Sequence, residues 1–173
     1  MRPRWNGRGW SSMGRGNRST DSRRYFDWLY HSKLDFLAAE LLIQDERCYN
    51  AVAFHCQQCI EKALKGYLLF KNRKLLDGHN LTWLCKQAVL QDKTFMQWLT
   101  KSATLNRYYI ETRYPADIPL EISPDMIRDL LRSTEEMLDF ICEQIRFDFS
   151  SYPRHVKRPV HRSGKDEAVH AAP

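Results

Sequence analysis

Apolar residues recur at intervals of three and four along most of the chain, which is the pattern of amphipathic helices. In residues 21–45 the recurring positions are Tyr25, Leu29, Leu34, Leu37, Leu41 and Leu42, preceded by the N-cap candidates Ser19, Thr20 and Asp21. The same spacing predicts helices over about 48–71, 80–91, 94–114 and 124–149. No alternating apolar and polar run predicts a strand. The pattern therefore indicates an all-α protein.

Turn signals separate these predicted helices. Asp77-Gly78 breaks the pattern after the second helix. The fourth helix should stop before Pro115, because the residue that precedes a proline avoids the helical region. Ser123 and Pro124 are a good N-cap and first-turn pair for the last helix. Its expected inward positions are Ile127, Leu130, Leu131, Met137, Leu138, Ile141 and Ile145. Short connections make neighbouring helices antiparallel, so we expect an up-and-down bundle of four to five helices.

Charge and composition divide the chain of 173 residues into three parts. Residues 1–20 are rich in Gly, Arg and Ser and are predicted to be a disordered leader, residues 21–149 form the helical bundle, and residues 150–173 are predicted to be a disordered basic tail. The net charge is +6, yet residues 25–149 hold 15 basic and 18 acidic side chains. The excess of base thus belongs to the tails. The leader is interpreted either as a flexible segment or as an Arg and Trp arm that touches nucleic acid.

The cysteine content and the hydropathy of the sequence indicate where in the cell the protein is located. No apolar run approaches the roughly 18 residues that a membrane helix needs, and the start of the chain lacks the apolar region of a secretory signal. The five cysteines show no framework of paired disulfides. The sequence predicts a cytoplasmic protein with no membrane partner.

The second predicted helix has two distinct faces at about 100° per residue. One face carries the apolar and small residues Val52, Cys56, Cys59, Ile60, Ala63 and Tyr67, and the opposite face carries Gln58, Glu61, Lys62 and Lys65. We expect a core stripe and a solvated stripe, with Glu61 and Lys65 as an i,i+4 ion pair. His55, Cys56 and Cys59 are too few for zinc, which needs about four ligands, so the cysteines are interpreted as core residues. No metal and no cofactor is predicted.

This helix also carries a resemblance to a known family. The segment AFHCQQCIEKALKGYLLF (53–70) resembles the AFHAQQAAEKALKALL helix of the HEPN family, which has small residues where Cys56 and Cys59 stand. Three further segments resemble that family in the same order: Leu34-Asp35-Phe36 through Leu41-Leu42, GHNLTWL (78–84) and LNRYYIETRYP (105–115). Together they cover about residues 25–149.

The resemblance implies a compact helical bundle that is often dimeric and is often encoded beside a minimal nucleotidyltransferase. The groove of such proteins has been linked to nucleotides or RNA. Some members are metal-independent ribonucleases of toxin–antitoxin pairs, with Arg-x(4–6)-His on the helix that corresponds to 94–114. Here Arg107 is followed at the matching distance by Arg113, and a guanidinium that stays charged cannot act as a general base. We therefore predict no catalytic residue.

A second pair of residues has the Arg-x(4–6)-His spacing but does not lie on the helix that carries this motif in the family. Arg73 and His79 are separated by five residues, but they lie across a turn between other helices. We treat this spacing as a coincidence. His79 is instead expected to cap or pack against the third helix.

The predicted ligand-binding residues come from two helices: Lys62, Lys65, Arg107, Tyr109, Arg113 and Tyr114. Cations and tyrosines together suit a phosphate and a stacked base. The alternative is that Arg107 forms a surface pair with Glu111 and that Arg113 packs on Tyr109. The leading hypothesis is a homodimeric, non-catalytic protein that binds nucleotide or RNA and acts as a partner subunit of a nucleotidyltransferase. The alternatives are a metal-independent ribonuclease toxin and a purely structural dimeric adaptor.

Overall fold

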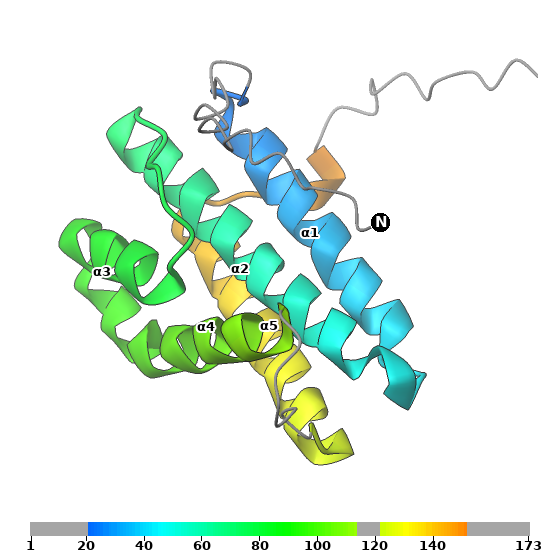
Figure 1. Ribbon diagram of the computed structural model, residues 1–173. Coiled ribbons are helices and arrows are strands. Elements are labelled where there is room, and N and C mark those ends of the chain that lie inside the picture. Colours follow the sequence, from blue (N-terminus) through cyan, green and yellow to red (C-terminus); the bar gives the residue numbers. More distant parts are fainter. Residues whose placement is uncertain (1–20, 114–121, 152–173) are drawn as a thin grey trace, which may run out of the picture.

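The computed structural model describes the backbone of residues 21–113 and 122–151, and the side chains of residues 21–108 and 122–150 (Figure 1). Its α-helices are α1 (Tyr25–Leu42), α2 (Tyr49–Asn72), α3 (Leu81–Gln91), α4 (Leu99–Arg113) and α5 (Pro124–Gln144). Short 3₁₀ helices are η2 (Glu46–Cys48), η3 (Lys93–Trp98) and η4 (Phe149–Ser151). No strand occurs in these two described ranges. The prediction of an all-α helical bundle is confirmed.

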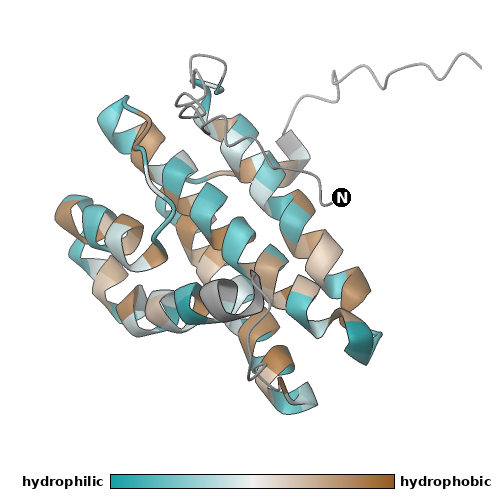
Figure 2. Cartoon of the chain, viewed as in Figure 1, coloured by the Kyte–Doolittle hydropathy of each residue, from teal (hydrophilic) through white to brown (hydrophobic). Residues whose placement is uncertain are grey.

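Helix α2 is the centre of the bundle. It contacts α1, α3, α4 and α5, with α1 along one side and the pair α3 and α4 on the other (Figure 1). Its buried side chains Ile60, Leu64 and Tyr67 pack in one core with Phe36 of α1 and Met137 of α5. Figure 2 shows hydrophilic and hydrophobic residues alternating along α2, as expected of a helix with two different faces. None of the helices in the described part of the chain is long and apolar enough to cross a membrane.

Gly66 allows α1 and α2 to approach closely. A Cβ atom at this position would lie 3.1 Å from Cγ of Leu29 and 3.1 Å from the backbone oxygen of Tyr25. Glycine inside a helix costs about 1 kcal/mol relative to alanine. The close contact between the two helices accounts for a glycine here.

Local hydrogen bonds set where the helices begin. Ser123 caps α5 as predicted, since its side chain accepts a hydrogen bond from the backbone N–H of Met126 at 3.3 Å. Asn80 caps α3 in the same way through the N–H of Trp83, at 2.9 Å. The N-cap residue of α1 is Arg24, which makes no side-chain cap, so the prediction of Asp21 as the cap is wrong. The candidates Ser19 and Thr20 lie outside the described residues.

Two predicted helices differ from the structure in extent. The segment predicted as one helix over 94–114 is instead η3 followed by α4, and the side chain of Asp92 caps the start of η3 through the N–H of Thr94. The last helix, predicted to reach 149, ends at Gln144. Arg146 has a positive φ of 51°, and the N–H of Phe147 bonds back to the oxygen of Cys142 at 2.9 Å, which turns the chain out of the helix.

The leucines that predicted α1 do not all face the core. Leu29 is buried together with Phe36 and Ala39, whereas Leu41 is 78% exposed. Leu34 and Leu37 are also exposed. Helix α1 therefore has an apolar outer face as well as an apolar inner face.

Candidate ligand-binding site

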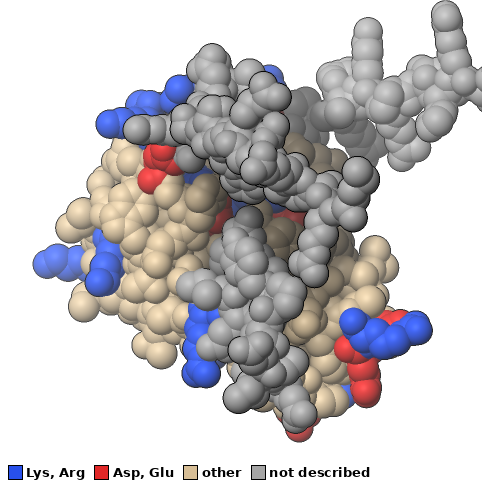
Figure 3. Space-filling model, viewed as in Figure 1, with Lys and Arg blue, Asp and Glu red and all other residues tan. Residues whose placement is uncertain are grey.

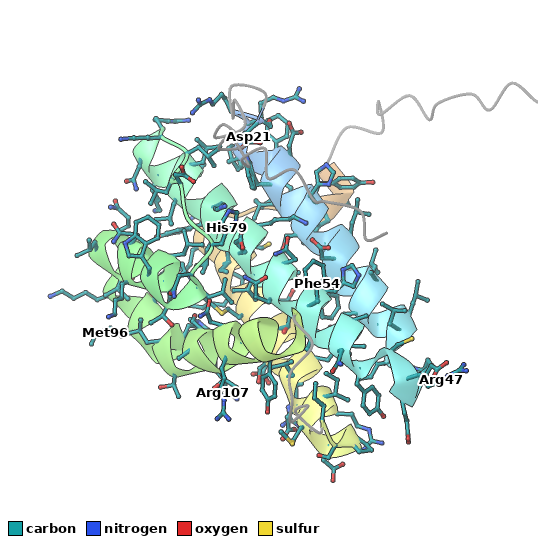
Figure 4. The ribbon with its side chains drawn as sticks, in the orientation of Figure 1. Asp21, Arg47, Phe54, His79, Met96 and Arg107 are labelled. Carbon is teal, nitrogen blue, oxygen red and sulfur yellow. The ribbon has the colours of Figure 1, made fainter. Side chains whose placement is uncertain are left out.

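A pocket of about 400 Å³ lies between the start of α1, the middle of α2 and the segment 73–80. Figure 4 shows two of its residues, Asp21 and His79, beside α2. The lining combines cationic, acidic, aromatic and apolar side chains: Asp21, Arg23, Trp28, Glu61, Lys62, Lys65, Leu75, Leu76, Asp77 and His79. It therefore contains both lysines that the sequence analysis selected from α2.

Glu61 organises one wall of this pocket. Its Oε1 accepts a hydrogen bond from Lys65 Nζ at 2.9 Å and lies 2.8 Å from Nδ1 of His79. Its Oε2 accepts a hydrogen bond from Gln57 Nε2 at 3.1 Å. The predicted ion pair of Glu61 and Lys65 is thus present. The prediction that these residues lie on a solvated stripe is wrong, since Glu61 is 4% exposed and Lys65 is 5% exposed.

Backbone contacts hold His79 at the rim of the pocket. The amide of Gln57 donates to the backbone oxygen of His79 at 3.4 Å, and the next residue, Asn80, caps α3. Gly78 precedes it with a φ of 143°, a conformation that favours glycine, and a Cβ there would lie 3.1 Å from the Trp83 ring. The N-cap of the third helix is Asn80 and not His79, which corrects the capping half of the prediction that His79 caps or packs against this helix. Its side chain is 62% exposed even though Nδ1 contacts the buried Glu61.

A second carboxylate repeats this arrangement beside the pocket. Asp35 of α1 contacts His55 Nδ1 at 3.0 Å through Oδ1, and its Oδ2 accepts a hydrogen bond from Lys62 Nζ. Each of the two carboxylates, Asp35 and Glu61, thus holds one imidazole and one lysine. Lys62 belongs both to this cluster and to the pocket lining.

Trp28 provides the aromatic surface of the site. Lys65 Nζ lies 5.5 Å from the centre of the Trp28 ring, within the range of a cation–π contact. The indole N–H donates a hydrogen bond to the backbone oxygen of Ser22 at 2.9 Å, which fixes the ring. Leu75 and Leu76 add apolar lining. The indole ring, the two leucines and the lysines together suit a ligand that has a flat apolar part and an anionic part.

The pocket is close to electrically balanced. Arg23, Lys62 and Lys65 are opposed by three carboxylates that also line it, Asp21, Glu61 and Asp77. On the face drawn in Figure 3 the visible Lys and Arg side chains form separate groups and no continuous basic patch. An anion that enters the pocket must therefore compete with carboxylates for the lysines.

Arg107, the fourth-helix candidate whose side chain is described, does not line the pocket. Arg107 is exposed on α4 and points away from His79 (Figure 4). Its neighbour Asn106 accepts a hydrogen bond from the N–H of Leu81 at 3.1 Å, which joins α4 to the start of α3. The side chains of Tyr109 and Arg113, and the whole of Tyr114, lie outside the described residues. Of the six predicted residues, the structure brings Lys62 and Lys65 together.

The sequence analysis did not select Trp28, Arg23 or His79 as residues of this pocket. In the sequence, the segment 78–84 indicates only a family resemblance and a helix start. The contact between His79 and Glu61 joins positions 18 residues apart. Helical periodicity relates residues within one helix only, so it gives no signal for such a contact.

The cysteines of α2 are core residues, as predicted. Cys56 and Cys59 are fully buried. Burial raises the pKa of Cys56 to about 12 and also raises the pKa of Cys59 above its usual range. Their thiols are therefore neutral at ordinary pH and unsuited to nucleophilic chemistry.

Comparison with known proteins identifies the family. The family model of the HEPN domain matches residues 25–145. The chain belongs to the HEPN family.

Solved structures that are similar to this chain include two that share its fold. One is TT1696 from Thermus thermophilus, which is 25% identical with a TM-score of 0.60 and covers 71% of this chain and 99% of its own. The other is ST0689, an archaeal HEPN homologue, which is 24% identical with a TM-score of 0.57 and covers 70% of this chain and 98% of its own. A search of curated proteins returned no match.

Proposed function

We propose that this HEPN protein binds a nucleotide or a short RNA in the pocket beside Glu61, as a non-catalytic partner subunit of a minimal nucleotidyltransferase. The observation that carries the proposal is the pocket itself. It gathers two lysines, an arginine, a histidine and an indole around about 400 Å³, a volume in the range of small-molecule sites.

The two parts of a nucleotide match two parts of this pocket. Lys62, Lys65 and Arg23 can donate charge-assisted hydrogen bonds to phosphate oxygens. Trp28, with the nearby leucines, offers a surface on which a base can stack. Because each base has a π-face, this mode of binding favours nucleotides without fixing a base identity.

The sequence at the ribonuclease motif supports the non-catalytic part of the proposal. Arg113 occupies the position of the motif histidine, and Arg107 is exposed on α4 and does not line the pocket. We expect no ribonuclease activity above background at neutral pH. Cleavage of single-stranded RNA that disappears in Arg107→Ala would instead favour the ribonuclease alternative. The nucleotidyltransferase partner is supported by family membership.

Equilibrium titration with ATP and with a hydroxyl-ended hexa-adenylate tests the pocket. Lys62→Met and Lys65→Met keep much of the side-chain volume but remove the charge, and each should weaken binding by about 1.5–3 kcal/mol, roughly tenfold to a hundredfold. Lys86→Met is the matched control, because Lys86 is an exposed lysine on α3 outside the pocket. Affinity should also fall as salt is raised.

Unchanged affinity in both pocket variants would place the ligand elsewhere, with the basic tails as the next candidate. The candidates Arg107, Tyr109, Arg113 and Tyr114 remain a prediction about contact with nucleotide or RNA. Arg107→Ala and Arg113→Ala are expected to weaken binding of the oligonucleotide. If neither does, the ligand surface is confined to the pocket.

A further inference from the structure

Two nitrogen atoms that differ in their access to solvent contact the carboxylate of Glu61. Both Lys65 Nζ and His79 Nδ1 contact the same oxygen, Oε1, at 2.9 and 2.8 Å. Lys65 is 5% exposed and forms an ion pair with Glu61, whereas the side chain of His79 is 62% exposed. His79 can therefore exchange a proton with solvent while it stays in contact with the buried carboxylate.

A phosphate in the pocket competes directly with Glu61 for Lys65. If the ammonium turns toward the phosphate, the buried carboxylate loses its main counter-charge, which is strongly unfavourable. A protonated His79 can replace that charge without a large movement, because Nδ1 already lies at hydrogen-bond distance. Protonation of His79 and binding of an anion should then favour each other.

The other charged groups around His79 do not cancel this effect. The charged residues that line the pocket with His79 come from three segments. They are Glu61, Lys62 and Lys65 of α2, Asp77 of its own segment, and Asp21 and Arg23 of the segment before α1. Asp35 holds the ammonium of Lys62, which reduces the repulsion from that lysine. Asp77 and Arg23, which line the same pocket, are both exposed and carry opposite charges. Glu61 is the charge in direct contact with the imidazole.

We propose that binding of a phosphate group in this pocket is coupled to the uptake of one proton by His79, which replaces Lys65 as the counter-ion of Glu61. The inference rests on the proposed nucleotide- or RNA-binding function and specifies how that site is regulated. By linkage, the affinity rises as the pH falls. Because one proton is taken up with the ligand, the dissociation constant should increase by up to tenfold per pH unit over the range in which the imidazole loses that proton.

The test uses the full chain and a hydroxyl-ended hexa-adenylate. Its phosphodiesters do not titrate between about pH 5.5 and pH 8, so a pH-dependent affinity reports on the protein. Calorimetry near pH 7 in two buffers of different ionisation enthalpy counts the protons taken up. We expect an uptake that approaches one proton per bound oligonucleotide.

Histidine variants identify the proton acceptor. His79→Asn keeps an N–H donor for Glu61 but cannot become charged, and it should remove both the pH dependence and the proton uptake. His31→Asn is the matched control, because His31 is an exposed histidine of α1 outside the pocket, and it should keep the wild-type slope. A slope that survives in His79→Asn, or one that is lost in His55→Asn, would overturn the proposal.

Glu61→Gln tests the competition between Glu61 and the phosphate for Lys65 by removing the carboxylate. Without the carboxylate, Lys65 has no anion to leave, so binding should become independent of pH and at least as tight as wild type at about pH 8. A thermal melt verifies that this variant folds, and the exposed His79→Asn variant decides the matter if it does not. Binding without proton uptake would refute the coupling alone. Absence of oligonucleotide binding at every pH would refute the proposed function as well.

Discussion

Because Glu61 and Lys65 form a buried ion pair, a mutation at this site can change the stability of the protein as well as its ligand affinity. Removing one partner of a buried ion pair leaves the other charge uncompensated, which is far more destabilising than losing an exposed pair. At this site His79 provides a second partner for Glu61, at 2.8 Å. Lys65→Met should therefore retain a paired carboxylate. Its ligand affinity can then be separated from its stability when both are measured.

The five cysteines should differ sharply in reactivity toward a disulfide reagent at about pH 8. Cys48 is half-buried, whereas Cys56, Cys59, Cys85 and Cys142 are buried. Burial raises the pKa of Cys56 and Cys142 to about 12 and raises the pKa of Cys85. Because the thiolate is the nucleophile, the native protein should show one fast thiol and the unfolded protein five. Cys48→Ser should remove the fast phase, and two or more fast thiols in the native protein would contradict the described burial.

At the scale of elements, most helices could be predicted because their signals are local. The spacing of apolar residues in α2, the Ser123-Pro124 start of α5 and the break at Gly78 each depend on a few neighbouring residues. The split of the segment 94–114 into η3 and α4 was missed, although the cap of η3 by Asp92 is also a local feature. Such boundaries depend on whether the 3₁₀ or the α-helical pattern of backbone hydrogen bonds is the more stable.

The face that each helix buries was less predictable than the helix itself. Helix α1 has apolar residues on two sides, so periodicity alone could not decide between Phe36, which is buried, and Leu41, which is exposed. The site was predictable only in part for a related reason. Lys62 and Lys65 lie on one helix, but Trp28 and His79 reach the pocket from other segments. Tertiary contacts of this kind require the fold.

The contact between α1 and α2 at Gly66 should be sensitive to a single methyl group. In Gly66→Ala the new Cβ meets Leu29 and the backbone of Tyr25 at about 3.1 Å. Overpacking typically costs about 1–3 kcal/mol, and the gain in helix propensity is about 1 kcal/mol. We expect a net loss of about 1 kcal/mol in urea unfolding and a larger loss for Gly66→Val. The penalty of Gly66→Ala should shrink in a Leu29→Ala background, and equal penalties in both backgrounds would show that the helices do not meet there.

For the whole molecule, the outer face of α1 is the feature that the bundle leaves unexplained. Leu34, Leu37 and Leu41 are exposed and lie at intervals of three and four residues, so they share one side of the helix. Contiguous apolar patches on a protein surface commonly mark sites of association. A stripe along one helix can pair with its own copy around a two-fold axis, because such an interface uses the same surface twice.

We expect a homodimer in solution at micromolar concentration, in keeping with the family resemblance. The double variant Leu37→Glu and Leu41→Glu should be a monomer, because the outer face of α1 would then carry like charges against its copy, while its helical circular dichroism stays unchanged. The matched control is Leu90→Glu, since Leu90 is an exposed leucine of α3, and it should leave the dimer intact. Light scattering measures all three proteins. A monomeric wild type would refute the predicted dimer, and a dimer that persists in the α1 double variant would place the interface on another face.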